Sequence, residues 1–507
     1  MRETKDMKRV HRFSKTIRIC LFAFLLGGWM TSSLITGCSG RKEVPPGRVL
    51  AEIGDKVVTV DDLRYRAELT VRLARIETPA AVLNNLIAEK LLSIEAGDTS
   101  RLARSERFQA YVRGIREQAM REALYQELAV KPVQIDTAEI MRTYRLSQRV
   151  YYVEFLTINN PDIQARIDAR LTADPDARPE VFDELKELGE TGFQTVKWRD
   201  PEADPIHLAL FSRPLGAGEV IGPVRLDGYQ SIMMRVADAR IQPVIGPEDQ
   251  RMRIDQVRAK LTDLKARATW NAYKAGLMRG KSIQFEKEVF NQIVEWFMAA
   301  HAEREAHRYQ DRGEDNPIDL KSPEQLEALR DQPFFRENGK VWTVEDFRRA
   351  VMSRPLVYRQ TPGRHEPFPE RFKRAVGDLV VDRYLNEAAY GRGLDKLPEV
   401  RHEGRLWSDA LLARHHLEQH LKKMDLETLQ QQDPAYLGMR AVDEYLVRLR
   451  DKYEKKIRID YDALEEIELT RVPLAALRHE MPYPMAVPGF PQYTTADTLI
   501  FGGGRAP

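Results

Sequence analysis

The sequence predicts a mainly α-helical protein with two similar helical modules, the first of which is interrupted by an inserted α+β domain. Two observations lead to this fold class. A segment of β-forming residues occurs twice, at 54–63 and 338–347, and each copy precedes a helix-like stretch. The first copy also carries additional residues with strand character that the second copy lacks. Such an internal repeat determines the architecture of a chain.

The two copies match at a constant spacing. Lys56, Val57, Thr59, Val60 and Asp62 correspond to Lys340, Val341, Thr343, Val344 and Asp346. The helix-like stretches that follow are 86–96 and 379–389. A third pair of segments, 283–286 and 457–460, has the same apolar alternation, and we expect each segment to close its own copy.

The elements of the first module follow from local patterns. Residues 49–60 predict a hairpin that turns at Gly54, and Asp61 predicts a helix start because carboxylates cap free N–H groups. Apolar residues recur at spacings of three and four through 81–130, which is typical of helices. Asp136 opens a sequence that resembles a capping box and predicts a further helix.

The insertion begins with 150–158, a strand of nearly continuous β-formers. It ends with a glycine-punctuated turn and a second strand at 229–236. Strands and helices in this order predict an α+β unit. An amphipathic helix is expected from 254 to about 278.

The remaining chain contains a connector, further helices and a tail of low complexity that we expect to be disordered. The predicted divisions are a signal peptide at 1–37, a tether at 38–48, the first helical module at 49–148, the α+β domain at 149–243, the closing helix of the first module at 244–298, the connector at 299–333, the second helical module at 334–470, and the tail at 471–507.

The composition limits the classes of function. The chain has 507 residues, 31% of them charged, and a net charge of only +2. Acidic and basic residues are interleaved, so no basic face for nucleic acid is predicted. The two cysteines are Cys20 and Cys38, and no disulfide is expected in the mature protein.

The N-terminus has the features of an export signal. Seven basic residues precede a short apolar run at 19–30, which is too short to span a bilayer that needs about 20 residues. The run ends in Leu-Ile-Thr-Gly-Cys38-Ser39, which resembles the lipobox of bacterial lipoproteins. The resemblance implies diacylation of Cys38, cleavage before it, and membrane anchoring. Ser39 resembles the outer-membrane sorting class, so we expect a periplasmic lipoprotein, or one on the outer face of a Gram-positive membrane.

Several segments together resemble the SurA/PrsA-type chaperones of the parvulin prolyl isomerase family. The matching stretches include 49–63, 83–92, 133–144, 215–224 and 227–232. In the last two, a Gly-Glu-x-x-Gly-Pro-Val turn leads into a Gly-Tyr strand, as at the end of a parvulin domain. The resemblance covers residues 49–295 well and 336–470 more weakly. It implies that the α+β domain is parvulin-like and that unfolded exported polypeptides are the partners.

The family's catalytic residues are replaced. Parvulins usually carry one histidine in the first strand and another in the last, and these positions hold Glu154 and Gln230 here. Isomerisation crosses a barrier of ~18–20 kcal/mol. Because both family histidines are replaced, we expect isomerase activity to be weak or lost. Phe155, Trp198, Phe211 and Tyr229 are the candidates for an apolar peptide-binding groove.

No cofactor or metal is predicted. His416 and His420 lie one helical turn apart, but no third ligand follows, so we interpret this segment as a charged helix face. The sequence thus predicts a lipid-anchored extracytoplasmic chaperone. Two alternatives remain open: an active prolyl isomerase with a rearranged site, and a structural envelope lipoprotein that uses the parvulin-like unit for docking.

Overall fold

The computed structural model describes residues 47–69, 78–98, 100–189, 191–200, 202–226, 230–307, 327–358, 366–424, 438–469, 492–494 and 501. The predicted signal peptide, Cys38 and most of the tether lie outside these residues, as do much of the connector and most of the tail. No helix in the described ranges is long and apolar enough to cross a membrane.

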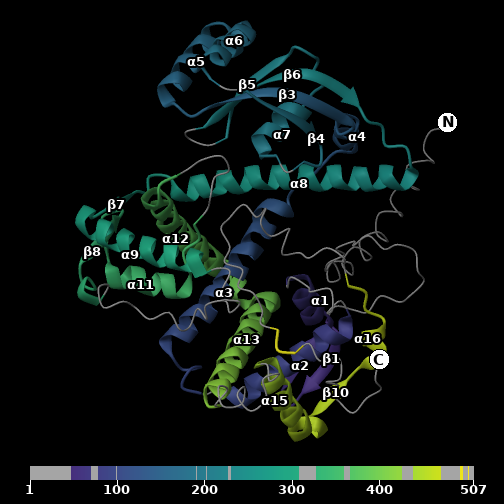
Figure 1. Cartoon of the computed structure of the whole chain (residues 1–507), viewed down its shortest axis with the longest axis vertical. Helices are drawn as coiled ribbons and strands as arrows, with labels where there is room; N and C mark the ends of the chain where they lie inside the picture. The colour runs from purple at the N-terminus through teal and green to yellow at the C-terminus, as the bar shows by residue number, and fades with distance from the viewer. Residues whose placement is uncertain are drawn as a thin grey trace, which may run out of the picture.

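The described chain is mostly helical and contains small antiparallel sheets (Figure 1). The strands are β1 (Val49–Ile53), β2 (Lys56–Thr59), β3 (Arg149–Ile158), β4 (Gly192–Lys197), β5 (Val220–Arg225), β6 (Ser231–Ile241), β7 (Ile283–Phe285), β8 (Pro333–Glu337), β9 (Lys340–Thr343) and β10 (Ile457–Ile459). The main helices are α1 (Val60–Leu69), α2 (Pro79–Ala96), α3 (Glu106–Tyr125), α4 (Thr137–Leu146), α5 (Pro161–Ala173), α6 (Arg178–Leu188), α7 (Asp204–Phe211), α8 (Pro247–Met278), α9 (Lys287–His307), α11 (Val344–Ser353), α12 (Phe368–Gly391), α13 (Pro398–Lys422), α15 (Gly438–Tyr453) and α16 (Tyr461–Glu465).

The repeated segments adopt the same local structure. In each copy a hairpin leads directly into a helix: β1–β2 into α1, and β8–β9 into α11. The first strands of the two hairpins, β1 and β8, have the same order of buried and exposed residues. A threonine–aspartate pair caps each helix. The backbone N–H of Thr59 donates to Asp62 at 2.7 Å, and that of Thr343 donates to Asp346 at 3.0 Å. The internal repeat predicted from sequence is therefore present as a pair of hairpin–helix units.

The closing strands, however, are exchanged relative to the prediction. β10 pairs with β1 of the first copy, with Ile457 opposite Ile53, whereas β7 pairs with β8 of the second copy, with Ile283 opposite Glu337. The segment expected to close the first module thus completes the second, and the C-terminal segment returns to complete the first. Both closing strands are short and similar in sequence, so their local pattern does not select a partner.

Each hairpin has its own hydrophobic core. The first core combines β1, β2 and α2 with residues of α13 and α15, including Leu446 and Leu449. The tail also contributes, because Tyr493 and Phe501 are buried there. The expectation of a disordered tail is wrong at these positions. The second core is rich in phenylalanine and joins β8, α9, α11 and α12.

The inserted α+β unit lies apart from both modules, above the long helix α8 in Figure 1. Its four-stranded antiparallel sheet has the order β4-β3-β6-β5. The unit is thus inserted between α4 and α8, as predicted, although α8 begins at Pro247 rather than at residue 254. Below it, α8 packs beside the end of α3, where the rings of Trp270 and Tyr125 are 5.4 Å apart.

Candidate functional site

The two faces of the inserted sheet are covered by different helices. One face packs on α5 and α6 through Leu156, Phe182 and Met233. The other packs on α7 and on part of α8 through Val153, Met234 and Val257. Side chains alternate between these faces along each strand, so each predicted site residue can be assigned to a side.

Trp198 and Phe211, two of the predicted peptide-binding aromatics, are buried, although Trp198 also contributes to the lining of a cavity. Trp198 and Phe211 are 6% and 4% exposed, and their rings meet edge to face at 5.4 Å inside the core beneath α7. Phe155 is half-buried beside this core, and its ring covers Gly192 so closely that a Cβ there would lie 2.3 Å away. Tyr229 lies outside the described residues. Trp198 and Phe211 therefore stabilise the unit as core residues.

The same core contains a histidine that the sequence analysis did not single out. The Nε2 atom of His207 lies 3.3 Å from the carbonyl oxygen of Trp198, and its ring is 4.4 Å from the Trp198 ring. Burial, together with the charge of Lys260, lowers the pKa of His207 to about 4. The imidazole is therefore neutral near pH 7. The only sequence signal was a histidine within the apolar stretch of α7.

Glu154 and Gln230, which occupy the family's histidine positions, are not neighbours. Glu154 lies opposite Arg235 in the β3–β6 ladder, whereas Gln230 precedes the first residue of β6. The Glu154 carboxylate faces α6 and pairs with Lys186 at 2.6 Å. Glu154 and Gln230 therefore lie apart, because the β3–β6 register separates them by several positions along β6.

A cavity of about 640 Å³ lies where the inserted unit joins α8. It is lined by the residues that enter β3, by those that follow β4 and β6, and by the first turns of α8. Its charged lining residues are Arg149, Lys197, Arg199, Asp200, Asp249 and Arg253. Arg253 also donates to the carbonyl oxygen of Ser147 at 2.7 Å, which ties α8 to the start of the unit.

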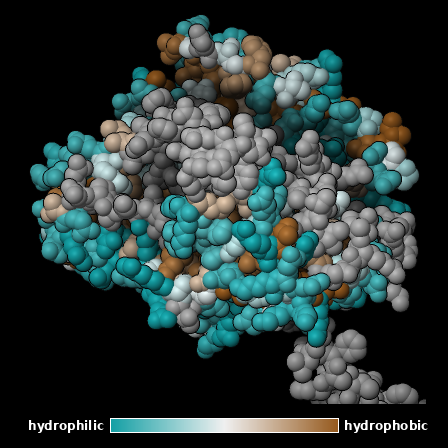
Figure 2. Space-filling model, turned by 60° about the horizontal axis from the view of Figure 1, so that its bottom comes forward, coloured by the Kyte–Doolittle hydropathy of each residue, from teal (hydrophilic) through white to brown (hydrophobic). Residues whose placement is uncertain are grey.

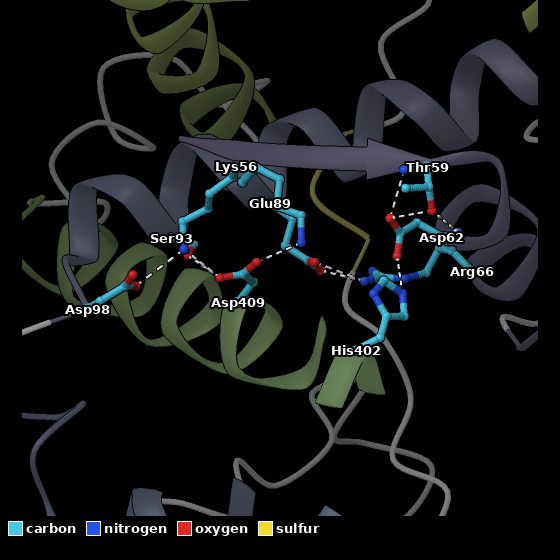
Figure 3. A network of polar contacts seen from close by, with 10 residues as sticks. Lys56, Thr59, Asp62, Arg66, Glu89, Ser93, Asp98, His402 and Asp409 are labelled. Atoms are coloured by element: carbon cyan, nitrogen blue, oxygen red, sulfur yellow. Dashed lines mark hydrogen bonds and ion pairs between the residues drawn. The ribbon is translucent and has the colours of Figure 1, made fainter. Parts of the chain in front are cut away.

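A network of polar contacts lies in the first module, where the hairpin, α1 and α2 meet α13 (Figure 3). Asp409 of α13 accepts from Lys56 and from Lys90, each at 2.6 Å, and from Ser93 at 3.0 Å. All three donors come from the first repeat. Three donors around one carboxylate therefore fix the position of α13 against the hairpin and α2.

Next to Asp409 lies a buried ion pair. Glu89 is fully buried, and its two carboxylate oxygens accept from Arg66 at 2.9 and 2.8 Å. Burial raises the pKa of Glu89, while Arg66 and Lys90 oppose that increase. A buried charge of this kind is stable only while its partner remains in place.

At the other end of the network His402 of α13 contacts Asp62 of α1 at 2.6 Å. The hydrogen bond to Asp62 raises the pKa of His402. Burial acts to raise the pKa of Asp62, but His402 and the Thr59 N–H outweigh it and hold that pKa below its usual value. The contact should therefore weaken in acid, where Asp62 becomes protonated, and in base, where His402 loses its proton.

The second repeat places a carboxylate at the corresponding position of α12. Asp382, the counterpart of Glu89 in the matched stretches, is 2% exposed and pairs with Arg354 and with Arg121, the latter at 3.4 Å. Because Arg121 belongs to α3, this second buried pair joins the two modules. The two carboxylates hold helices together.

His416 and His420, near the C-terminal end of α13, form packing contacts. The ring of His420 stacks on Tyr445 at 3.7 Å, and Nε2 of His416 lies 2.8 Å from the Tyr445 hydroxyl. Among the described residues no group of three His, Cys, Asp or Glu side chains is arranged to hold a metal ion.

Comparisons with known proteins add no family assignment. No model of a known protein family matches the chain, and no curated protein matches it.

Proposed function

We propose that this chain is a lipid-anchored folding factor of the cell envelope that binds unfolded exported polypeptides. The observation that carries the proposal is the combination of two hairpin–helix modules with an α+β unit inserted between α4 and α8. This arrangement agrees with what the resemblance to SurA/PrsA-type chaperones implies.

The inserted unit is proposed to be parvulin-like. Its elements follow in the order β3, α5, α6, β4, α7, β5 and β6. The turn before β5 is held by Gly218 and Glu219, whose backbones bond to that of Val236 on β6 at 2.7 and 2.9 Å. This supports the proposal that residues 215–236 correspond to the C-terminal part of a parvulin domain, in which a Gly-Glu turn leads to the last strand.

Isomerase activity is proposed to be weak or lost. A polar network beneath the twisting amide requires two groups side by side, and Glu154 is instead opposite Arg235 and paired with Lys186. His207 is a different histidine from those of the family pattern. It is enclosed by Trp198 and Phe211, which keep it away from a bound peptide.

Holding unfolded chains requires accessible apolar side chains rather than one deep pocket. The described residues on the face shown in Figure 2 are mainly hydrophilic, and hydrophobic residues form separate groups among them, one of them at the top of the view. On the inserted unit and the start of α8 the described chain exposes Leu188, Phe193, Leu208, Ile241, Ile245 and Met252. Their distribution supports binding of varied segments at several places.

Membrane attachment through Cys38 is part of the proposal. A Cys38→Ser variant should move from the membrane fraction to the soluble periplasmic fraction, and mass spectrometry of the wild-type N-terminus should find an acylated cysteine. An unmodified Cys38, or a membrane-bound Cys38→Ser variant, would overturn the anchoring.

The activity is tested with the purified mature chain in two assays. The first follows light scattering of an aggregating unfolded protein. The second follows refolding of a small ribonuclease whose slow phase is prolyl isomerisation. Suppressed aggregation with an unchanged slow phase is expected. Acceleration that is lost in Gln230→Ala would favour the isomerase. Absence of both effects, together with recovery of one stoichiometric envelope partner, would favour a docking lipoprotein.

A further inference from the structure

The outer edge of β4 has unpaired backbone groups. β4 is the last strand of the sheet and pairs only with β3 on its inner side. The Lys197 N–H donates to Asp200 Oδ2 at 2.7 Å and its carbonyl accepts from the Asp200 N–H at 3.0 Å, so the backbone groups of Lys197 point away from β3. The β3–β4 register is uninterrupted, so those of Phe193 and Thr195 point the same way.

Unlike Lys197, these two residues have no hydrogen-bond partner on that side within the part of the chain that the structure describes. Among the described residues, no backbone hydrogen bond is found for Phe193 or Thr195 beyond the β3–β4 ladder. Two N–H groups and two carbonyls therefore form a short open edge that ends at the Lys197–Asp200 turn. Natural sheets usually protect such edges, because they are templates for another extended chain.

The side chains along this edge favour a particular kind of segment. One face of β4 carries the side chains of alternate residues, Phe193, Thr195 and Lys197, and all three are exposed. Phe193 is 73% exposed, and Leu188 at the end of α6 is 80% exposed. Glu154, opposite Phe193, bonds to Lys186 of α6, so this face is the one that carries α6.

We propose that the β4 edge binds an extended segment of an unfolded polypeptide as an additional strand. An apolar residue of that segment lies beside Phe193, and an acidic residue lies beside Lys197, an exposed cation on the same face. Backbone hydrogen bonds give affinity that depends little on sequence, and alternate side chains add preference. This inference rests on the proposed function and names how the substrate is recognised.

A second copy of the chain is the less suitable occupant. Stable protein interfaces bury at least about 1,200 Å² in total. The open part of β4 is only two residues long, because the Lys197–Asp200 turn closes one end. Pairing of two such edges would involve too few residues for a stable dimer, whereas a flexible peptide needs only a short edge.

The test uses the purified mature chain and a dye-labelled ten-residue peptide of alternating valine and threonine with one glutamate, measured by fluorescence anisotropy. Thr195→Pro removes an N–H that the β3 ladder does not use and obstructs the edge. Thr195→Val is the matched control because it retains the N–H. Binding should weaken at least tenfold in Thr195→Pro and remain unchanged in Thr195→Val.

The charge preference and the site are tested separately. Lys197→Glu should bind the glutamate peptide less tightly than wild type and a lysine-substituted peptide more tightly. In the wild-type chain, hydrogen exchange at the amides of Phe193 and Thr195 should slow when peptide is added. This measurement decides the question even if Thr195→Pro does not fold.

The outcomes separate the two proposals. If the wild type suppresses aggregation, but peptide binding survives in Thr195→Pro and the two amides are not protected, strand addition is overturned and the folding-factor proposal stands. A dimer that Thr195→Pro dissociates, with peptide binding unchanged, would assign the edge to a second copy and overturn the inference. A wild type that neither suppresses aggregation nor binds the peptide would overturn both.

Discussion

Arg48 and Asp460 are 412 positions apart in sequence, yet the arginine Nη2 lies 2.6 Å from the aspartate Oδ2. The contact lies where the C-terminal strand β10 joins β1, beside a hydrogen bond of 2.8 Å from the Asp460 N–H to the Leu50 carbonyl. The two ends of the described chain thus build one module, and the second module, completed by β7, is formed by the chain between them. The stability of the N-terminal module should therefore depend on residues near the C-terminus.

The closing strand gives the first prediction. Ile457 is 5% exposed in the first core, so Ile457→Ala should lower the free energy of unfolding by about 2–4 kcal/mol. Arg458 on the same strand has an 82% exposed side chain, and Arg458→Ala is the matched control with no expected effect. Urea denaturation, followed by a probe in α2, measures the difference. Equal stability of the two variants would contradict the pairing of β10 with β1.

The second prediction concerns the buried pair of Arg66 and Glu89. Glu89→Ala leaves Arg66 buried without its carboxylate partner and should lower stability by about 3–5 kcal/mol. The double variant Arg66→Leu/Glu89→Leu should recover most of this loss, because neither charge remains buried. Glu184→Ala, which removes the exposed pair with Arg170, serves as a control and should change little. A double variant as unstable as Glu89→Ala would contradict the assignment.

The third prediction concerns pH and the contact between His402 and Asp62. The pKa of His402 is raised above 6.5, so its contribution is fully present below about pH 6.5 and is lost as the pH rises through the raised value. Asp62 has a lowered pKa, so its contribution is lost only in acid. Asp61, Lys90 and Arg405 are the other charges acting on this contact.

His402→Gln should therefore lower the free energy of unfolding by about 1 kcal/mol near pH 6, a modest value because the imidazole is partly exposed. The difference from wild type should become smaller at pH 9. Urea titrations at both pH values measure it, and a difference that grew with rising pH would show that His402 is not held protonated by Asp62.

The fourth prediction concerns His207 in the inserted unit. In the folded protein its pKa is lowered from 6.5 to about 4. As the pH falls, the imidazole therefore binds a proton in the unfolded chain before it does so in the folded one. The unit should lose up to about 3 kcal/mol of stability between pH 6.5 and 4 from this group. His207→Gln should reduce this acid dependence, measured by tryptophan fluorescence during denaturation. An unchanged pH profile would mean that the imidazole is accessible to solvent.

Much of the local structure was predictable. The hairpins, the Asp136 cap of α4 and the position of the inserted unit follow from turn residues, capping side chains and apolar periodicity. These signals act over a few residues. The anchored tail residue Tyr493 was missed because its burial depends on Asn85, which bonds to the Tyr493 N–H from far away in sequence.

The exchange of closing strands and the polar network were not predictable for a related reason. Ile283–Phe285 and Ile457–Ile459 have nearly the same pattern, so only the path of the chain decides which hairpin each strand joins. Asp409 and His402 are polar residues on a long helix, where an exposed face is the simplest expectation. Their burial follows from the packing of α13 on α2, which has no local signal.

The proposed folding factor should bind polypeptides because they are unfolded. The most direct measurement is complex formation between the purified mature chain and reduced, carboxymethylated α-lactalbumin, which cannot refold, followed by analytical ultracentrifugation. A complex with the unfolded form and none with the native form is the predicted result. Absence of a complex with the unfolded form, or equal binding of both forms, would contradict the claim.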